Sequence, residues 1–131
     1  MSAHILIIDD EAPMRNMLSR CLKPMGCHSL EAETVGEALA VLRTQPVDLI
    51  LLDLMLPDVD GYSFFELLRE AHMEVPVIVI SGCVSQEALD LAWELGAVDY
   101  VTKPFSPTEL IFRVRKALAS PAVRRRASVT R

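Results

Sequence analysis

The sequence is poor in the residues that fix structure or chemistry by themselves. It has 3 cysteines, 5 glycines and 5% aromatic residues in 131 positions. Cys21, Cys27 and Cys83 form neither a CxxC pair nor a set with metal-ligand spacing, so a cysteine-bound metal is not indicated. An odd number of scattered cysteines fits a reducing cytoplasm, where cysteine acts as a small buried hydrophobe.

Long apolar stretches are missing as well. No run approaches the roughly 18 residues that a membrane span needs. Residues 75–80 are too few even for the apolar region of a secretory signal, and the N-terminus lacks the basic start of such a signal. We therefore expect a cytoplasmic protein with no membrane partner. No glycine-rich phosphate loop follows the first apolar run, so nucleotide binding is not supported.

Charge is distributed unevenly along the chain, whose formal net charge is −5. All 18 acidic residues but only 9 of the 13 basic ones fall within residues 1–119. The other four are Arg124, Arg125, Arg126 and Arg131. An acidic body is a poor candidate for direct contact with nucleic acid. Because 51% of the residues are hydrophobic, we expect one compact domain over residues 1–119 and a basic tail or linker over residues 120–131.

Strand-like and helix-like patterns alternate along the chain. Short apolar runs predict strands at residues 4–9, 27–32, 47–53, 75–80 and 98–102. Helical spacing of apolar residues predicts helices at residues 12–23, between Thr34 and Pro46, from Gly61 to about residue 71, from Ser85 to Gly96, and at residues 107–119. Such alternation predicts an α/β fold, a doubly wound parallel sheet that helices cover on both faces.

Polar residues collect where the predicted strands end. Asp9 and Asp10 end the first strand, Asp53 ends the third, Ser81 follows the fourth and Lys103 follows the fifth. In an open parallel sheet, ligands bind beyond the carboxyl ends of the strands. We therefore expect these five side chains to converge on one edge of the sheet.

The residue types at this edge indicate phosphoryl transfer. Three nearby carboxylates repel one another, and a hard divalent cation is the natural way to offset that repulsion. Mg²⁺ prefers carboxylate, carbonyl and water oxygens and commonly shares them with phosphate. A lysine adds a compact positive charge for phosphate oxygens. A carboxylate can itself accept a phosphoryl group as an acyl phosphate. Because the acids are crowded and phosphate adds further negative charge, we expect Mg²⁺ as the cofactor.

Four segments at the strand ends resemble the receiver domains of response regulators from two-component systems. They are residues 5–11 (ILIIDDE), 51–61 (LLDLMLPDVDG), 79–82 (VISG) and 96–105 (GAVDYVTKPF). The likeness covers residues 4–119 in order and at the family's spacing. It implies a flavodoxin-like (βα)5 fold with the strand order 2-1-3-4-5. It also implies a phosphorylation-activated signalling switch that is not an enzyme beyond its own phosphorylation and slow dephosphorylation.

The resemblance assigns roles at the site. Asp53 corresponds to the phosphoacceptor, and a sensor histidine kinase or a phosphotransfer protein would supply the phosphoryl group. The implied metal ligands are Asp9, Asp10, Asp53 and the backbone carbonyl of Met55. The implied phosphate contacts are Ser81 and Lys103.

The resemblance further implies two conformational features and one kinetic one. Tyr100 would be a switch residue whose ring turns inward when Ser81 moves toward the phosphate. The peptide bond before Pro104 is expected to be cis, which proline permits. Met55 and Cys83 flank the water path in this family, and neither positions an attacking water well. We therefore predict slow self-dephosphorylation.

The signalling face is expected on the fourth helix, fifth strand and fifth helix. In the winged-helix class of response regulators, the positions of Trp93 and Phe112 belong to an apolar dimer patch. Asp99 and Arg113 match a cross-dimer ion pair of that class. Two interpretations stay open: dimerisation through this face, or packing of Trp93 and Phe112 within the monomer. A linked output domain is a further possible partner.

Each assignment has a simpler alternative. Asp9 and Asp10 could only cap the first helix, because acids favour its positive end. Ser81 could be a turn residue, Lys103 a solvated surface residue and Tyr100 a static core ring. Two other functions also compete: a receiver-like interaction module that is never phosphorylated, and an aspartyl-phosphate hydrolase. The hydrolase is disfavoured because haloacid-dehalogenase-like enzymes carry an Asp-x-Asp on the first strand, and this chain has adjacent acids there.

Overall fold

The structure is a computed structural model that describes residues 2–57, 59–82 and 85–120. Within these ranges, strands and helices alternate along the chain. The strands are β1 His4–Ile8, β2 His28–Ala32, β3 Leu49–Asp53, β4 Val77–Ser81 and β5 Asp99–Thr102. The helices are α1 Ala12–Leu22, α2 Val35–Thr44, α3 Gly61–Glu70, α4 Gln86–Glu94 and α5 Pro107–Leu118, with a 3-10 turn at Lys23–Met25.

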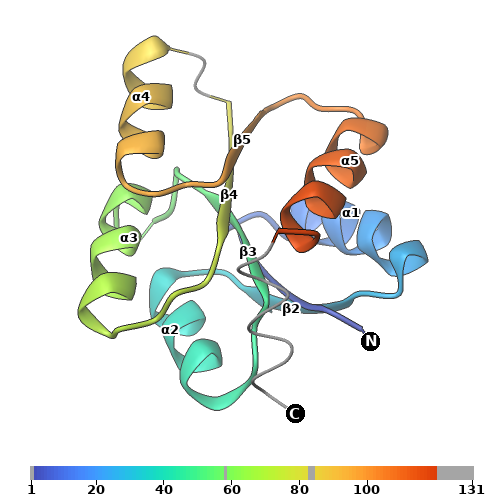
Figure 1. Cartoon of the computed structure of the whole chain (residues 1–131), viewed down its shortest axis with the longest axis horizontal. Coiled ribbons are helices and arrows are strands. Elements are labelled where there is room, and N and C mark those ends of the chain that lie inside the picture. Colours follow the sequence, from blue (N-terminus) through green and yellow to red (C-terminus); the bar gives the residue numbers. More distant parts are fainter. Residues whose placement is uncertain (1, 58, 83–84, 121–131) are drawn as a thin grey trace.

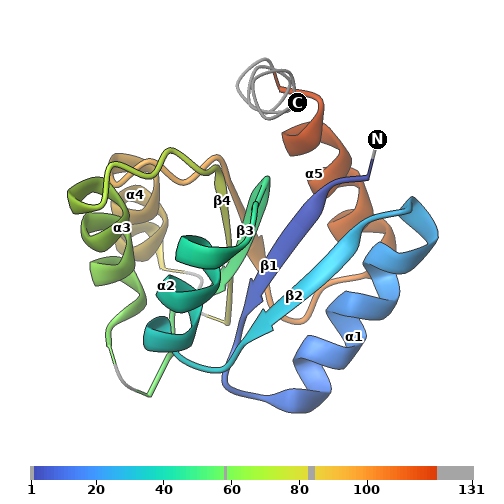
Figure 2. The ribbon, with the colours of Figure 1, turned by 90° about the horizontal axis from the view of Figure 1, so that it is seen from below.

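The strands form one parallel sheet in the order β2-β1-β3-β4-β5. Helices α1 and α5 cover one face, and α2, α3 and α4 cover the other (Figures 1 and 2). The predicted doubly wound α/β fold and its strand order are confirmed. The chain winds outward from β1 to β2 and then returns to β3, so the strand order reverses between β1 and β3. Ligands bind at such a switch point in folds of this type.

Two separate apolar cores hold the helices to the sheet. Alternate side chains of β1 point to opposite faces, so Leu6 and Ile8 join the core under α2, α3 and α4. Ile5 and Ile7 join the core under α1 and α5. Every residue of β3 and β4 is buried, as expected for central strands that are covered on both faces. Burial of each large apolar side chain contributes about 1.5–3 kcal/mol, which makes these strands a rigid support for their polar ends.

Side-chain caps set where several helices begin. The hydroxyl of Thr34 accepts a hydrogen bond from the backbone N–H of Glu37, and the hydroxyl of Ser85 accepts one from Ala88. Both were predicted helix starts. Gly96, just after α4, has a φ of 105°, a conformation that glycine adopts without strain. Among the helices of the described residues, none is long and apolar enough to cross a bilayer.

One boundary difference of two residues concerns the fourth strand. The apolar run predicts a start at residue 75, whereas β4 begins at Val77. Pro76 has no N–H to donate, so the parallel ladder with β3 starts one residue after it. The Pro76 carbonyl still accepts a hydrogen bond from the N–H of Ile50. The prediction included Val75 and Pro76 because apolar character alone does not register the missing donor.

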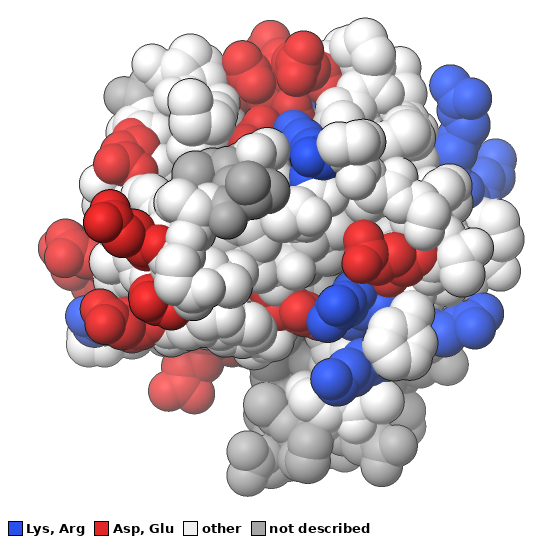
Figure 3. Space-filling view, turned by 90° about the horizontal axis from the view of Figure 1, so that it is seen from above, with Lys and Arg blue, Asp and Glu red and all other residues white. Residues whose placement is uncertain are grey.

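Charge is unevenly placed on the face that carries α4 and α5. Figure 3 shows acidic side chains gathered toward the α4 side and basic side chains toward the α5 side. A broad area of uncharged side chains lies between them. Helix α4 contributes exposed acids such as Asp90, and α5 has Arg115 and Lys116 in its last turn. This face therefore combines an uncharged centre with flanks that differ in charge.

Candidate functional site

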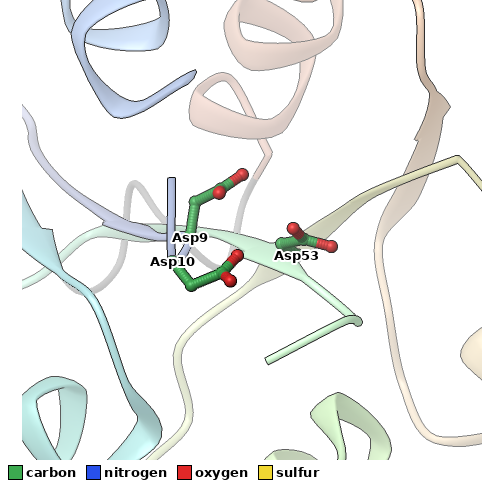
Figure 4. Close-up of side chains that lie close together, drawn as sticks. All are labelled: Asp9, Asp10 and Asp53. Atoms are coloured by element: carbon green, nitrogen blue, oxygen red, sulfur yellow. The ribbon is translucent and has the colours of Figure 1, made fainter. Parts of the chain in front are cut away.

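Three carboxylates meet where β1 and β3 end. Asp9 and Asp10 directly follow β1, and Asp53 is the last residue of β3. One carboxylate oxygen from each lies within 4.8 Å of the others (Figure 4). Asp9 and Asp53 are only 1% and 5% exposed, whereas Asp10 is the most accessible of the three. The expected convergence of these acids is thus present at the switch point of the sheet.

Lys103 provides the counter-charge. Its Nζ lies 3.2 Å from Oδ2 of Asp9 and 3.2 Å from Oδ2 of Asp53. Its backbone N–H donates to the carbonyl of Ser81 at 2.8 Å, which anchors the end of β5 to the end of β4. The Lys103–Pro104 peptide bond is cis. The lysine therefore bridges two of the acids and does not extend into solvent as a surface residue would.

Backbone N–H groups fix the remaining oxygens of the two buried acids. Oδ1 of Asp53 accepts a hydrogen bond of 3.0 Å from the N–H of Met55, and Oδ1 of Asp9 accepts one of 2.9 Å from the N–H of Glu11. Each carboxylate thus has one oxygen held by the chain two residues on and the other directed at Lys103. This arrangement orients both groups before any ligand arrives.

Burial and charge shift the ionisation of the site. Burial raises the pKa of Asp53, and the nearby charge of Asp9 adds to this effect. The hydrogen bond from Met55 and the charge of Lys103 act in the opposite direction but do not cancel it. Burial alone would lower the pKa of Lys103, yet attraction to Asp53 and Asp9 outweighs burial and raises it. The lysine therefore stays protonated, whereas burial and the charge of Asp9 disfavour the ionised form of Asp53.

The sequence analysis missed Arg15. Its Nη1 donates to the backbone carbonyl of Asp9 at 2.7 Å, and its Nε is 3.0 Å from Oε1 of Glu31. The side chain is only 15% exposed. Arg15 therefore ties α1 and β2 to the segment that carries Asp9 and Asp10. Nothing in the local sequence signals this role, because Glu31 reaches the site only through the pairing of β1 with β2.

Gly61 was predicted only as the start of a helix, and the structure shows a stricter requirement at this position. A Cβ at this position would lie 2.6 Å from the Cα of Leu54 and 2.8 Å from its carbonyl oxygen. The N–H of Gly61 donates to that carbonyl at 3.2 Å. The start of α3 therefore closes directly on the loop that follows Asp53, and this contact shapes the loop that contains Met55.

An open pocket adjoins the acids. It has a volume of about 460 Å³ and is lined by Asp10, Ser81 and residues of the β3–α3 loop that include Met55. Of these lining residues, Ser81 is fully buried, whereas Met55 is 74% exposed. Asp10 is the acid of the cluster that lines this pocket, so the pocket opens the cluster to solvent on the side of Asp10.

The donor set fits a hard cation. Three carboxylates within 4.8 Å of one another offer oxygen ligands, which Mg²⁺ prefers together with several waters. Asp10 would supply the most accessible oxygen, with Asp53 and Asp9 behind it. The backbone carbonyl of Met55 stays a predicted ligand. Because like charges are crowded here, a divalent cation would relieve repulsion that Lys103 only partly offsets.

Tyr100 was predicted to be a switch residue, and the surface formed by α4, β5 and α5 was predicted to be the signalling face. Tyr100 is 8% exposed and belongs to the core beneath α2, α3 and α4. Trp93 and Phe112 are 46% and 60% exposed, so neither residue is buried in the core. Trp93 lies on α4 and Phe112 on α5, and their role as a dimer patch stays a prediction.

The predicted cross-dimer ion pair is formed within the chain. Nη1 of Arg113 lies 3.0 Å from Oδ1 and 3.2 Å from Oδ2 of Asp99. The reason is local: α5 packs beside β5 of the same sheet, which brings Arg113 over the first residue of that strand. Any use of this pair between two chains would require an exchange of partners. Cys83 and the tail from residue 121 lie outside the described residues.

Comparison with known proteins assigns the chain to a family. Residues 5–115 match the response regulator receiver domain. The chain is a response regulator receiver domain. It is 41% identical over 116 residues to the phosphate regulon transcriptional regulatory protein PhoB of Pseudomonas aeruginosa, covering 87% of this chain and 51% of that protein. This receiver domain thus spans about half the length of the curated relatives it matches.

Solved structures agree with the fold of this receiver domain. A CheY-like response regulator receiver domain protein from Methanospirillum hungatei JF-1 superposes with a TM-score of 0.83 at 28% identity, over 90% of this chain and 94% of that one. The BeF3-activated DrrB receiver domain superposes with a TM-score of 0.82 at 31% identity, over 92% and 100%. The family resemblance of the four strand-end motifs is therefore confirmed.

Proposed function

We propose that this receiver domain is a phosphorylation-activated switch, in which Asp53 accepts a phosphoryl group from a histidine kinase or a phosphotransfer protein. The observation that carries the proposal is the placement of the Asp53 carboxylate. It lies within 4.8 Å of two other carboxylates and 3.2 Å from a lysine ammonium, beside an open pocket. An ion pair with a purely structural role would need neither the two additional carboxylates nor a pocket that opens the cluster to solvent.

Each residue of the site has a separate role in the proposed phosphoryl transfer. A carboxylate oxygen of Asp53 forms a bond to phosphorus while the bond from phosphorus to the donor imidazole nitrogen breaks. The imidazole keeps the electron pair and takes up a proton from water. Met55 N–H holds Asp53 in orientation, and Lys103 sits where it can contact a phosphoryl oxygen. Ser81 is proposed to donate to another of these oxygens. Mg²⁺, when bound, would neutralise charge shared by the carboxylates and the phosphoryl group.

The response would be transmitted through the face formed by α4, β5 and α5. Tyr100 on β5 is the proposed switch, since its strand neighbours β4, which ends in Ser81. Trp93 and Phe112 offer exposed apolar area for a partner. We propose a second copy of the chain or a linked output domain as that partner. Residues 1–119 would form the receiver domain, and residues 120–131 a basic tail or linker.

Phosphorylation by a small phosphodonor tests this function. Incubation with acetyl phosphate and Mg²⁺ should add the mass of one phosphoryl group, and Asp53→Asn should abolish the addition. Asp90→Asn removes an exposed acid on α4 and serves as the matched control, in which the added phosphoryl mass should be retained. No modification of the wild type would favour a constitutive interaction module, and continuous release of phosphate at enzymatic rates would favour a hydrolase.

The same samples address the two finer proposals. After removal of the donor, slow loss of the added mass is expected, whereas a half-life of a few seconds with Mg²⁺ would contradict slow self-dephosphorylation. Sedimentation at micromolar concentration should show association of the phosphorylated chain that Trp93→Ala weakens. Identical sedimentation with and without phosphorylation would argue against dimerisation through this face.

A further inference from the structure

Two histidines and an acid lie together at the end of the sheet opposite to Asp53. His4 begins β1 and His28 begins β2, and the two are register partners in the parallel ladder. Their rings are stacked, with centroids 5.1 Å apart and planes inclined by 23°. Asp48 directly precedes β3, and its Oδ2 lies 3.8 Å from Nδ1 of His4. Figure 2 shows this end of β1 next to the N-terminus, away from the arrowheads that mark the carboxyl ends of the strands.

Backbone hydrogen bonds hold the three residues in place. The N–H of His4 donates to Oδ2 of Asp48 at 2.8 Å, and the N–H of Asp48 donates to the carbonyl of His4 at 2.8 Å. The N–H of His28 donates to the carbonyl of Ala3 at 2.8 Å. The starts of β1, β2 and β3 are therefore tied together. Their Cα positions need not change for the side chains to act as one group.

We propose that His4, His28 and Asp48 form a binding site for a divalent transition-metal ion of the Zn²⁺ type. Two imidazoles and one carboxylate are a ligand set that Zn²⁺ uses with an open fourth position. Ligand atoms bonded to one tetrahedral Zn²⁺ lie about 3.4 Å apart, since each bond is about 2.0–2.2 Å long. Nδ1 of His4 and Oδ2 of Asp48, at 3.8 Å, are already close to that spacing.

Ligand atoms of His4, His28 and Asp48 do not yet all lie within 4.8 Å of one another, so the His28 ring must turn out of its stack with His4 to complete the site. His28 is exposed, so its ring can turn about its own torsions without displacing core residues. The spacing of neighbouring strands, about 4.8 Å, places the two Cβ atoms at a distance from which both imidazoles can reach one ion. The His4 side chain is 36% exposed and that of Asp48 is 19% exposed, which leaves the site open to an ion and to its water ligand.

This site differs in chemistry from the carboxylate cluster at Asp53. Imidazole nitrogens favour Zn²⁺, Ni²⁺ and Cu²⁺ over Mg²⁺, which prefers oxygen ligands. The two sites should therefore bind different ions. The proposal does not depend on phosphorylation, because none of its three residues contacts Asp53, Asp9 or Lys103 in the described hydrogen bonds.

Calorimetric titration of the full chain with ZnCl₂ tests the proposal. All variants carry Asp53→Asn in addition, which removes one ligand from the acidic cluster and limits Zn²⁺ binding there. We expect one Zn²⁺ per chain with a dissociation constant in the micromolar range. His4→Gln, His28→Gln and Asp48→Asn should each weaken binding by at least about ten-fold. The ring signals of His4 and His28 should shift together in nuclear magnetic resonance spectra.

The third histidine provides the matched control. His72 lies in the turn after α3, and His72→Asn should leave binding unchanged, since asparagine tolerates its φ of 56°. Circular dichroism without Zn²⁺ shows whether each variant is folded. Absence of saturable binding below millimolar Zn²⁺, or binding that survives His28→Gln, would overturn the proposal.

Discussion

Replacing Asp53 with asparagine should raise the free energy of unfolding when no divalent cation is present. At the 4.8 Å that bounds their separations, each pair of ionised carboxylates repels by about 3.5 kcal/mol at an effective dielectric of about 20. The attraction of Asp53 to Lys103 at 3.2 Å is about 5 kcal/mol on the same scale. Neutralising Asp53 removes two repulsions and one attraction.

The balance favours the variant. The two repulsions exceed the lost attraction by about 2 kcal/mol. Screening of the more exposed Asp10 reduces this excess, whereas the lower desolvation cost of a buried neutral amide increases it. The amide oxygen can still accept the hydrogen bond from Met55. We therefore expect Asp53→Asn to stabilise the chain by about 1–2 kcal/mol in urea unfolding with a chelator present.

The pH dependence has a defined sign. Burial raises the pKa of Asp53 in the folded chain above its unfolded value of about 3.9. The stability linked to this group is therefore fully present below the unfolded pKa and is lost as pH rises through the folded pKa. The advantage of Asp53→Asn should be largest at neutral pH and should shrink toward pH 4. Asp90→Asn should change stability by less than about 0.5 kcal/mol. An unchanged or lower stability of Asp53→Asn at neutral pH would refute the reasoning.

Two further substitutions test the supports of the site. Gly61→Ala should destabilise the chain by about 1–3 kcal/mol, because the new methyl group meets backbone at 2.6 Å. Gly36→Ala, whose nearest contact is 3.8 Å, should be neutral or stabilising by up to about 1 kcal/mol, and equal urea midpoints for the two would contradict this. Arg15→Met should weaken Mg²⁺ binding measured by calorimetry, because the carbonyl of Asp9 loses its donor at 2.7 Å. Arg20 is exposed on the same helix, and Arg20→Met should leave Mg²⁺ binding unchanged. Equal weakening of Mg²⁺ binding in both variants would indicate that only the lost positive charge matters.

Prediction from sequence succeeded where the information is local along the chain. Thr34 and Ser85 were identified as helix starts because a capping hydroxyl bonds to an N–H three residues away. Prediction was less accurate at β4, where the effect of Pro76 on the ladder depends on its partner strand. Arg15 and Gly61 were missed as parts of the site, because their contacts join segments that only the folded chain brings together.

The sequence by itself determined the α/β class, the alternation of strands and helices, and the convergence of Asp9, Asp10, Asp53 and Lys103. Periodicity and strand-end residues can be read along the chain, and a parallel sheet places all strand ends of one kind at one edge. Only the tertiary structure decided which oxygens Lys103 bridges, that Asp99 and Arg113 pair within the chain, and that His4, His28 and Asp48 are neighbours. These outcomes depend on strand register, helix packing and rotamers, which no local pattern encodes.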